Sequence, residues 1–203
     1  MRTILASASP TRRKIFENLG VKFEVIPSNF DEKNPAKFST KELVKYLAEG
    51  KAKSVYKKFE QENNFIVLGF DSLVELDGEI IGKLKTKKSA LETFQKFRGK
   101  RVSLFSGVSI IGKFRGKFFQ ATDYEVSYIH FKADTTNCQI RDFLSYNDWQ
   151  GKAGGIAVEG ATQFLVEKIE GDWSNILGVP VLKMNQIIRE TLGKPPIKIF
   201  EKK

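Results

Sequence analysis

The segment from Ile66 to Lys83, IVLGFDSLVELDGEIIGK, carries an acid and a base at a spacing that suits catalysis. Its apolar run delivers Asp71 to the end of a predicted strand, and a short hairpin with a turn at Asp77-Gly78 returns Lys83 toward the same place. A carboxylate at the rim of a sheet can hold a divalent ion or activate water. The alternative is that Asp71 only caps a turn.

The segment SASPTRR near the N-terminus predicts an anion site at the start of a helix. Ser7 and Ser9 supply hydroxyl and backbone N–H groups, and the guanidinium groups of Arg12 and Arg13 can bind phosphate oxygens in a bidentate manner. Ser-x-Ser-Pro is also an ordinary N-cap of a helix. Both interpretations can hold at once.

Three further charged residues could complete such a site. Glu32, in a polar loop, could share one metal ion with Asp71 if the fold brings the two carboxylates together. Lys51, near the middle of a long predicted helix, could face the same anion as Lys83, although an exposed lysine is usually only solvated. Glu159 is a lone carboxylate in a glycine-rich segment, GKAGGIAVEG, which could line a ligand or form a passive connection.

Cysteine and histidine are too few for most metal sites. The one cysteine, Cys138, excludes an intrachain disulfide and a cysteine-rich zinc site, and the one histidine, His130, argues against a histidine site. A metal must then be held by carboxylates, which suit Mg²⁺ or Mn²⁺. We expect Cys138 in the core and His130 as a structural residue of a strand.

The net charge of +10 favours an anionic partner, such as a nucleotide, a nucleic acid or an acidic surface, without choosing among them. No apolar stretch approaches the ~20 residues that span a bilayer, and the start of the chain is unlike a secretory signal, so we expect a cytoplasmic protein without a membrane partner. The C-terminal KPPIKIFEKK is predicted to be a solvated tail.

Periodicity and turn residues predict an α/β chain without a linker, a repeat or a low-complexity block, and therefore a single domain over residues 1–203. We expect a curved mixed β-sheet flanked by helices, with an active-site cleft between two lobes. The predicted strands are 3–6, 23–27, the 66–83 hairpin, 101–112, 117–131 and 164–169, and the predicted helices are 12–19, 40–60, 87–97, 136–146 and 180–192.

Taken in order, six segments resemble the Maf family of nucleoside triphosphate pyrophosphatases over nearly the whole chain. The family pattern L-A-S-x-S-P-x-R is matched by LASASPTR, and an acidic loop by FDE. LAEGKA matches L-A-x-x-K-A, while GFDS with DGEIIGK matches a strand and hairpin motif. KAGGIAVEG and GDWSNILGVP match the two closing motifs. Departures include Thr11 for a frequent arginine, Leu84 for a frequent proline and Gly151 for a frequent aspartate.

The resemblance implies hydrolysis of a nucleoside triphosphate between its α and β phosphates by a homodimer that uses a divalent metal, Mg²⁺ or Mn²⁺. By position, Asp71 matches the essential carboxylate, as a general base or a metal ligand, and Glu32 the supporting metal-binding acid. Arg12, Lys51 and Lys83 match the basic residues around the triphosphate, and the hydroxyls of Ser7 and Ser9 join them in binding the substrate.

The resemblance leaves the base of the nucleotide open and places its selection at Arg12, Ser72 and Glu159. The branch that acts on 7-methyl-GTP usually has glutamate where this chain has Glu159, and a carboxylate can accept from the two N–H donors of a guanine edge. Ser72, however, resembles the threonine of the dTTP and UTP branch.

Two rival functions stay open at this point. One is a pyrophosphatase that removes deaminated purine nucleotides, which would use a similar architecture and similar chemistry. The other is a non-catalytic nucleic-acid-binding protein, which the basic charge would suit. No stripe of aromatic and basic residues of the kind that binds RNA is present, so a stable nucleic-acid partner is not expected.

Overall fold

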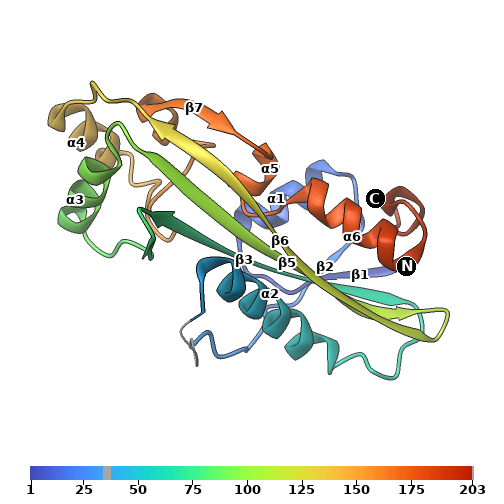
Figure 1. Ribbon diagram of the computed structural model, residues 1–203. Coiled ribbons are helices and arrows are strands. Elements are labelled where there is room, and N and C mark those ends of the chain that lie inside the picture. The colour runs from blue at the N-terminus through green and yellow to red at the C-terminus, as the bar shows by residue number, and fades with distance from the viewer. Residues whose placement is uncertain (34–37, 203) are drawn as a thin grey trace.

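A seven-stranded mixed sheet forms the spine of the computed structural model, which describes residues 1–33 and 38–202 (Figure 1). The strand order is β2-β1-β3-β5-β6-β7, and β4 pairs with β3 beside this path. The strands are β1 (Arg2–Leu5), β2 (Glu24–Val25), β3 (Phe65–Leu76), β4 (Glu79–Ile81), β5 (Arg101–Phe114), β6 (Lys117–Phe131) and β7 (Val166–Glu170). The expected mixed sheet flanked by helices is confirmed.

Helices cover both faces of the sheet and one of its ends (Figure 1). They are α1 (Pro10–Asn18), α2 (Thr40–Tyr56), α3 (Lys87–Phe97), α4 (Asn137–Ser145), α5 (Trp173–Ile176) and α6 (Val181–Leu192), with 3-10 turns η1 (Ala161–Leu165) and η2 (Pro196–Lys198). The α1 helix begins after Ser9, whose Oγ accepts from the backbone N–H of Arg12, so the N-cap interpretation of SASPTRR is confirmed.

Two different strands share one edge of β3 and leave a gap between them. The parallel partner β1 pairs with β3 only as far as Leu68, and the antiparallel partner β4 pairs with it only from Val74. The other edge of β3 pairs with β5 without interruption from Phe65 to Glu75. The segment between Leu68 and Val74 is therefore held firmly on one side and open on the other.

Asp71 lies inside this gap, so its predicted position at the end of a strand is wrong. The strand continues to Leu76, and the chain reverses at the expected turn, Asp77-Gly78. The Gly-x-Asp pattern marks the place where the neighbouring strand β1 has ended, because Leu5 is opposite Leu68. The rim that the sequence predicts as a ligand site is thus made by the end of β1 rather than by the end of β3.

Side-chain alternation along β3 assigns neighbouring residues to different helices. Residues 66, 68 and 70 pack in one apolar cluster with Phe16 of α1 and Met184 of α6. Residues 65 and 67 pack on the opposite face with Ala52 and Val55 of α2. This period directs Asp71 toward α2 and Ser72 toward α1.

The backbone of α2 packs closely against the sheet because two glycines of the sheet face the helix. A Cβ atom on Gly107 would lie 2.0 Å from the backbone oxygen of Val44, and one on Gly69 would lie 2.3 Å from that of Ala48. Gly107 is the partner of Asp71 across the β3–β5 ladder. The missing side chains therefore let α2 bring Lys51 to Asp71.

Three sequence predictions outside the site are corrected. Cys138 is exposed, because α4 turns Ile140, Phe143 and Leu144 to the core instead. The C-terminal segment is not a free tail: Ile199 is buried, and the backbone N–H of residue 22 donates to the oxygen of residue 201 over 2.8 Å. The strand predicted for 164–169 begins as the 3-10 turn η1. Among the described residues, no helix is long and apolar enough to cross a membrane.

Replacement of Gly107 by alanine should destabilise the fold by about 2 kcal/mol, because the new methyl group overlaps backbone atoms of α2 that cannot rotate away. Urea denaturation measures the free energy of unfolding. Gly82→Ala is the matched control, because a Cβ atom there has nothing within 4 Å. Equal effects of the two substitutions would contradict the close approach of α2.

Candidate active site

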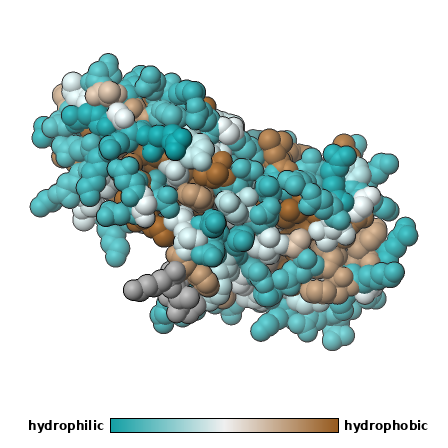
Figure 2. Space-filling model, in the orientation of Figure 1, coloured by the Kyte–Doolittle hydropathy of each residue, from teal (hydrophilic) through white to brown (hydrophobic). Residues whose placement is uncertain are grey.

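A pocket of about 560 Å³ opens at the gap in β3 and is lined by residues from both ends of the molecule. From one side come the start of α1 and the middle of α2, and from the other come the β4–α3 connection, the 151–159 segment and the loop before α6. The two ends are visible as separate masses of mostly hydrophilic surface in Figure 2. The pocket therefore corresponds to the cleft that was expected between two lobes.

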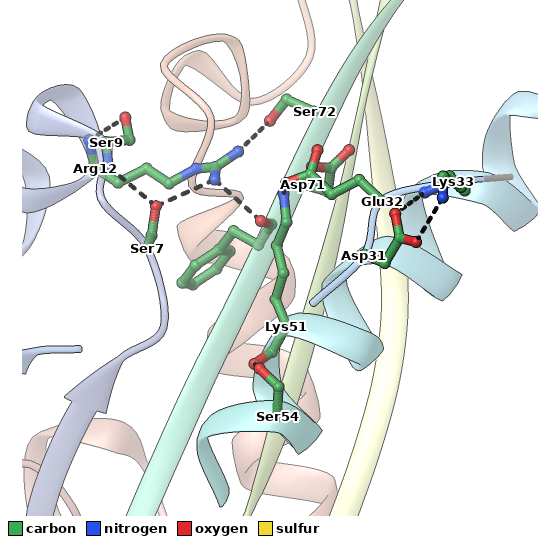
Figure 3. A network of polar contacts seen from close by, with 11 residues as sticks. Ser7, Ser9, Arg12, Asp31, Glu32, Lys33, Lys51, Ser54, Asp71 and Ser72 are labelled. Atoms are coloured by element: carbon green, nitrogen blue, oxygen red, sulfur yellow. Dashed lines mark hydrogen bonds and ion pairs between the residues drawn. The ribbon is translucent and has the colours of Figure 1, made fainter. Parts of the chain in front are cut away.

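Lys51 joins the two acidic residues that the sequence singled out. Its Nζ lies 2.5 Å from Oδ1 of Asp71 and 2.8 Å from Oε1 of Glu32 (Figure 3). The side chains of Lys51 and Asp71 are 11% and 10% exposed, whereas that of Glu32 is 58% exposed. The fold thus brings Glu32 and Asp71 together around one ammonium group. In this state, Lys51 is engaged by carboxylates rather than left free to meet an anion.

Arg12 crosses from α1 to the open edge of β3, where acceptors of four residues hold it. Its Nε donates to the Gly178 oxygen over 2.9 Å, and its Nη2 donates to Oγ of Ser72 over 3.1 Å. Its Nη1 donates to the backbone oxygen of Phe70 over 3.0 Å and to Oγ of Ser7 over 3.3 Å (Figure 3). Since a guanidinium has five N–H groups, only one, on Nη2, remains for a ligand.

This arrangement changes what Arg12 can do. Desolvation lowers its pKa, and the charges of Asp71 and Glu32 oppose that effect. With one N–H free, Arg12 can give a ligand a single oriented hydrogen bond but not the bidentate contact expected from the sequence. Arg13 points elsewhere, since its Nε donates to Glu17 on the exposed face of α1.

The two predicted serine ligands differ in their surroundings. Ser7 is buried, and its Oγ accepts from Arg12 and from the backbone N–H of Ser9. Ser7 therefore supports Arg12 and does not line the pocket. Ser9 does line it and also caps α1.

Lys83 lies on the opposite wall, fixed by a backbone bridge to Ala153. The next residue, Leu84, packs into the apolar core, so the extended chain returns Lys85 to the pocket side. Lys83 and Lys85 are both exposed, and neither has an acidic partner among the ion pairs of the described residues. Lys85 was missed because its sequence neighbours, Lys87 and Lys88, make it look like part of a solvated helix start.

Glu159 lies at the far side of the pocket in a small cluster with Lys152 and Thr11. Lys152 Nζ lies 2.5 Å from Oε1 of Glu159 and 2.8 Å from Oγ1 of Thr11. The Thr11 hydroxyl donates to the same Oε1 over 3.3 Å. Ser72, the other specificity candidate, contacts Arg12 instead. Sequence reasoning gave no role to Lys152 or Thr11, because 141 positions separate them.

The donor set fits a hard divalent cation only in part. Within the described ranges, residues 1–33 and 38–202, no group of three or more His, Cys, Asp and Glu side chains is close enough to hold a metal. Glu32 and Asp71 do supply two carboxylates beside a pocket, and Mg²⁺ is often held by one or two carboxylates together with substrate phosphates. These two residues therefore fit an ion that arrives with a phosphorylated ligand.

A family model described as Maf-like protein matches residues 2–191. The chain belongs to the Maf-like family. It is 36% identical over 193 residues to a dTTP/UTP pyrophosphatase of Caldicellulosiruptor bescii, with 95% of each chain covered. It is 34% identical to a dTTP/UTP pyrophosphatase of Clostridioides difficile, with 94% of this chain and 95% of that protein covered.

Among solved structures, the chain is similar to the Staphylococcus aureus Ham1 protein, with 18% identity, a TM-score of 0.45, and 66% of this chain and 73% of that one covered. The resemblance to the Maf family is confirmed by the family model and by the sequence relatives. The expected homodimer, the cytoplasmic location and the single domain over 1–203 stay predictions.

In this Maf-like chain, Arg12→Lys should lower the free energy of unfolding by about 1–3 kcal/mol, because a lysine cannot satisfy all of the acceptors that Arg12 now holds. Arg13→Lys is the matched control and should change it by less than about 0.5 kcal/mol, since its ion pair is exposed. Chemical denaturation of both variants checks the difference. Similar values would show that the network around Arg12 is weak.

Proposed function

We propose that this Maf-family nucleotide pyrophosphatase hydrolyses a nucleoside triphosphate between the α and β phosphates, releasing a nucleoside monophosphate and pyrophosphate. The observation that carries the proposal is the Lys51-bridged pair of Glu32 and Asp71 in a pocket that also presents Arg12, Lys83 and Lys85. Acidic groups that can handle water and cations that can bind phosphate are both needed for this reaction.

Asp71 is the proposed general base. Lys51 holds its Oδ1, so Oδ2 is the oxygen that can accept a proton from an attacking water. The uninterrupted β3–β5 ladder fixes the backbone of Asp71, and Lys51 fixes its side chain. The carboxylate is therefore held in one orientation before the substrate arrives, which removes part of the entropic cost of reaching the reactive geometry.

The cations are proposed to act on the phosphate groups. Arg12 would give its single free N–H to a phosphate oxygen, and Lys83 and Lys85 would balance the charge that grows on the leaving pyrophosphate. Glu32 would hold Mg²⁺ or Mn²⁺ together with the substrate phosphates, and Asp71 would contribute through Oδ1, because Oδ2 serves as the base. When bound, that ion would neutralise phosphate oxygens and polarise the phosphoryl group.

Asp71→Asn should reduce pyrophosphate release by at least about 100-fold, because the amide cannot accept the proton of the attacking water. Asp77→Asn is the control, since this carboxylate lies in the exposed hairpin turn after the same strand, and it should retain wild-type activity. Phosphate detection coupled to an inorganic pyrophosphatase measures the rate. If the wild type releases no pyrophosphate from any triphosphate with Mg²⁺ or Mn²⁺, the proposed function is wrong.

For the base, we propose uracil or thymine rather than guanine, although Glu159 by itself favours guanine. Lys152 and Thr11 occupy Oε1 of Glu159, so only Oε2 is left and the bidentate contact to a guanine edge is lost. The remaining N–H of Lys152 then stands beside a free carboxylate oxygen. Together they offer one donor and one acceptor, as a glutamine would, and this matches a pyrimidine edge. The names of the relatives, dTTP/UTP pyrophosphatase, support the same choice.

A panel of dTTP, UTP, GTP and 7-methyl-GTP should show a preference for the pyrimidines in the wild type and in Glu159→Gln. Lys152→Met should shift the ratio of kcat/KM values toward the guanine nucleotides by about 10-fold or more, because Oε1 of Glu159 loses its ammonium partner, keeps only the Thr11 hydroxyl, and can then accept from a guanine N–H beside Oε2. Lys168→Met, which removes a lysine from an exposed ion pair on β7 outside the pocket lining, is the control and should leave the ratio unchanged. A wild type that prefers 7-methyl-GTP would contradict the proposed role of Lys152.

A further inference from the structure

A row of hydrogen bonds leads from the pocket into the interior through two serine hydroxyls. Arg12 Nη2 donates to Oγ of Ser72 over 3.1 Å, and Oγ of Ser72 lies 2.9 Å from Oγ of Ser106. Ser106 in turn lies 3.4 Å from the backbone oxygen of Asn175. Ser72 and Ser106 face each other across the β3–β5 ladder, and Ser106 has no exposed surface. Figure 3 shows the pocket end of this row, where Arg12 reaches Ser72.

The direction of the row follows from its first member. A guanidinium can only donate, so Ser72 accepts from Arg12. All three contacts can be hydrogen bonds only if Ser72 donates to Ser106 and Ser106 donates to Asn175. If Ser106 instead donated to Ser72, the contact with Asn175 would be lost, because a hydroxyl has one hydrogen. A fully buried hydroxyl favours the arrangement with the larger number of bonds.

This direction has a consequence for the pocket. The hydrogen of Ser72 points inward to Ser106, so the Ser72 hydroxyl only accepts from Arg12. It has no hydrogen left to donate to a substrate oxygen that Arg12 would bind. Asn175 lies in the short helix α5, and the connection directly after this helix also holds Arg12, because the Gly178 oxygen accepts from Nε over 2.9 Å. Ser106 therefore connects two of the groups that fix the guanidinium, although Ser106 does not line the pocket.

We propose that Ser106 is a positioning residue, which acts through Ser72 to aim the one free N–H of Arg12 at the substrate phosphate. The proposal rests on the pyrophosphatase reaction proposed above. Since Arg12 is assigned to phosphate charge in that reaction, a misaimed N–H should slow the chemical step more than it weakens substrate binding.

Ser106→Ala tests the proposal, with Ser109→Ala as the matched control. Both serines lie on β5 with no exposed surface, and Ser109 makes a similar hydroxyl contact of 2.8 Å, but to Thr122 on β6. We expect Ser106→Ala to lower kcat about 10-fold with KM changed less than about twofold, and Ser109→Ala to change neither. Equal effects of the two substitutions would overturn the proposal.

A double-mutant cycle separates positioning from general damage to the core. If Ser106 acts through Ser72, the variant with both serines replaced by alanine should be about as slow as Ser72→Ala alone. Ser106→Thr, which keeps the hydroxyl, should recover most of the kcat. Additive losses, or a threonine variant as slow as the alanine variant, would overturn the proposal.

A measurement without substrate distinguishes failure of this inference from failure of the proposed function. The Nε–H signal of Arg12 in a ¹H–¹⁵N spectrum can be assigned by its loss in Arg12→Lys. Its exchange with solvent should be faster by about 10-fold or more in Ser106→Ala and unchanged in Ser109→Ala. An unchanged rate in both would overturn the inference even if the wild type is an active pyrophosphatase, whereas a faster rate in Ser106→Ala alone would support it even if the reaction proves to be another.

Discussion

The site depends on one interruption in the sheet, the stretch of β3 between the last residue paired with β1 and the first paired with β4. A strand edge that is left open exposes backbone groups that must find other partners. Here Arg12 supplies one, because its Nη1 donates to the backbone oxygen of Phe70. The substitute partner is a cation, so satisfying the backbone also places positive charge at the pocket.

Because side chains alternate along a strand, neighbouring residues in this gap point to opposite faces of the sheet. Asp71 faces α2 and meets Lys51, while Ser72, one residue later, faces α1 and meets Arg12. Burying Lys51 and Asp71 carries a desolvation cost that apolar residues at these two positions would not have. The cost is limited by a contact of 2.5 Å and by Glu32, whose exposed carboxylate reaches the same ammonium. The close packing of α2 over Gly107 is what makes so short a contact possible.

The sequence allowed most of the elements and the residue types of the site to be predicted, because periodicity, caps and turn residues are local signals. It did not allow the place of Asp71 within β3 to be predicted, since the residues at which β1 and β4 stop pairing with β3 are set by tertiary structure, and the Gly-x-Asp pattern does not distinguish the end of β3 from the end of its neighbour. The meeting of Glu32, Lys51 and Asp71 depends on tertiary packing in the same way. The prediction that Cys138 is buried was wrong because a short helix buries only one of its faces. The residue type of Cys138 alone does not show on which face of α4 it lies.

The basic residues of the pocket fall into two groups, those paired with acids and those without an acidic partner. The net charge of +10 does not distinguish these groups, so it could not identify the kind of anionic partner. Of the five basic residues that line the pocket, Lys51 and Lys152 are engaged by acids, and they fix the orientation of Asp71 and Glu159. Arg12, Lys83 and Lys85 form no ion pair within the described part of the chain, so they keep their charge for an incoming anion. A nucleic-acid surface would spread such free cations along a groove. Their convergence on one pocket, beside two carboxylates, instead suits a small polyanion that is bound and then hydrolysed.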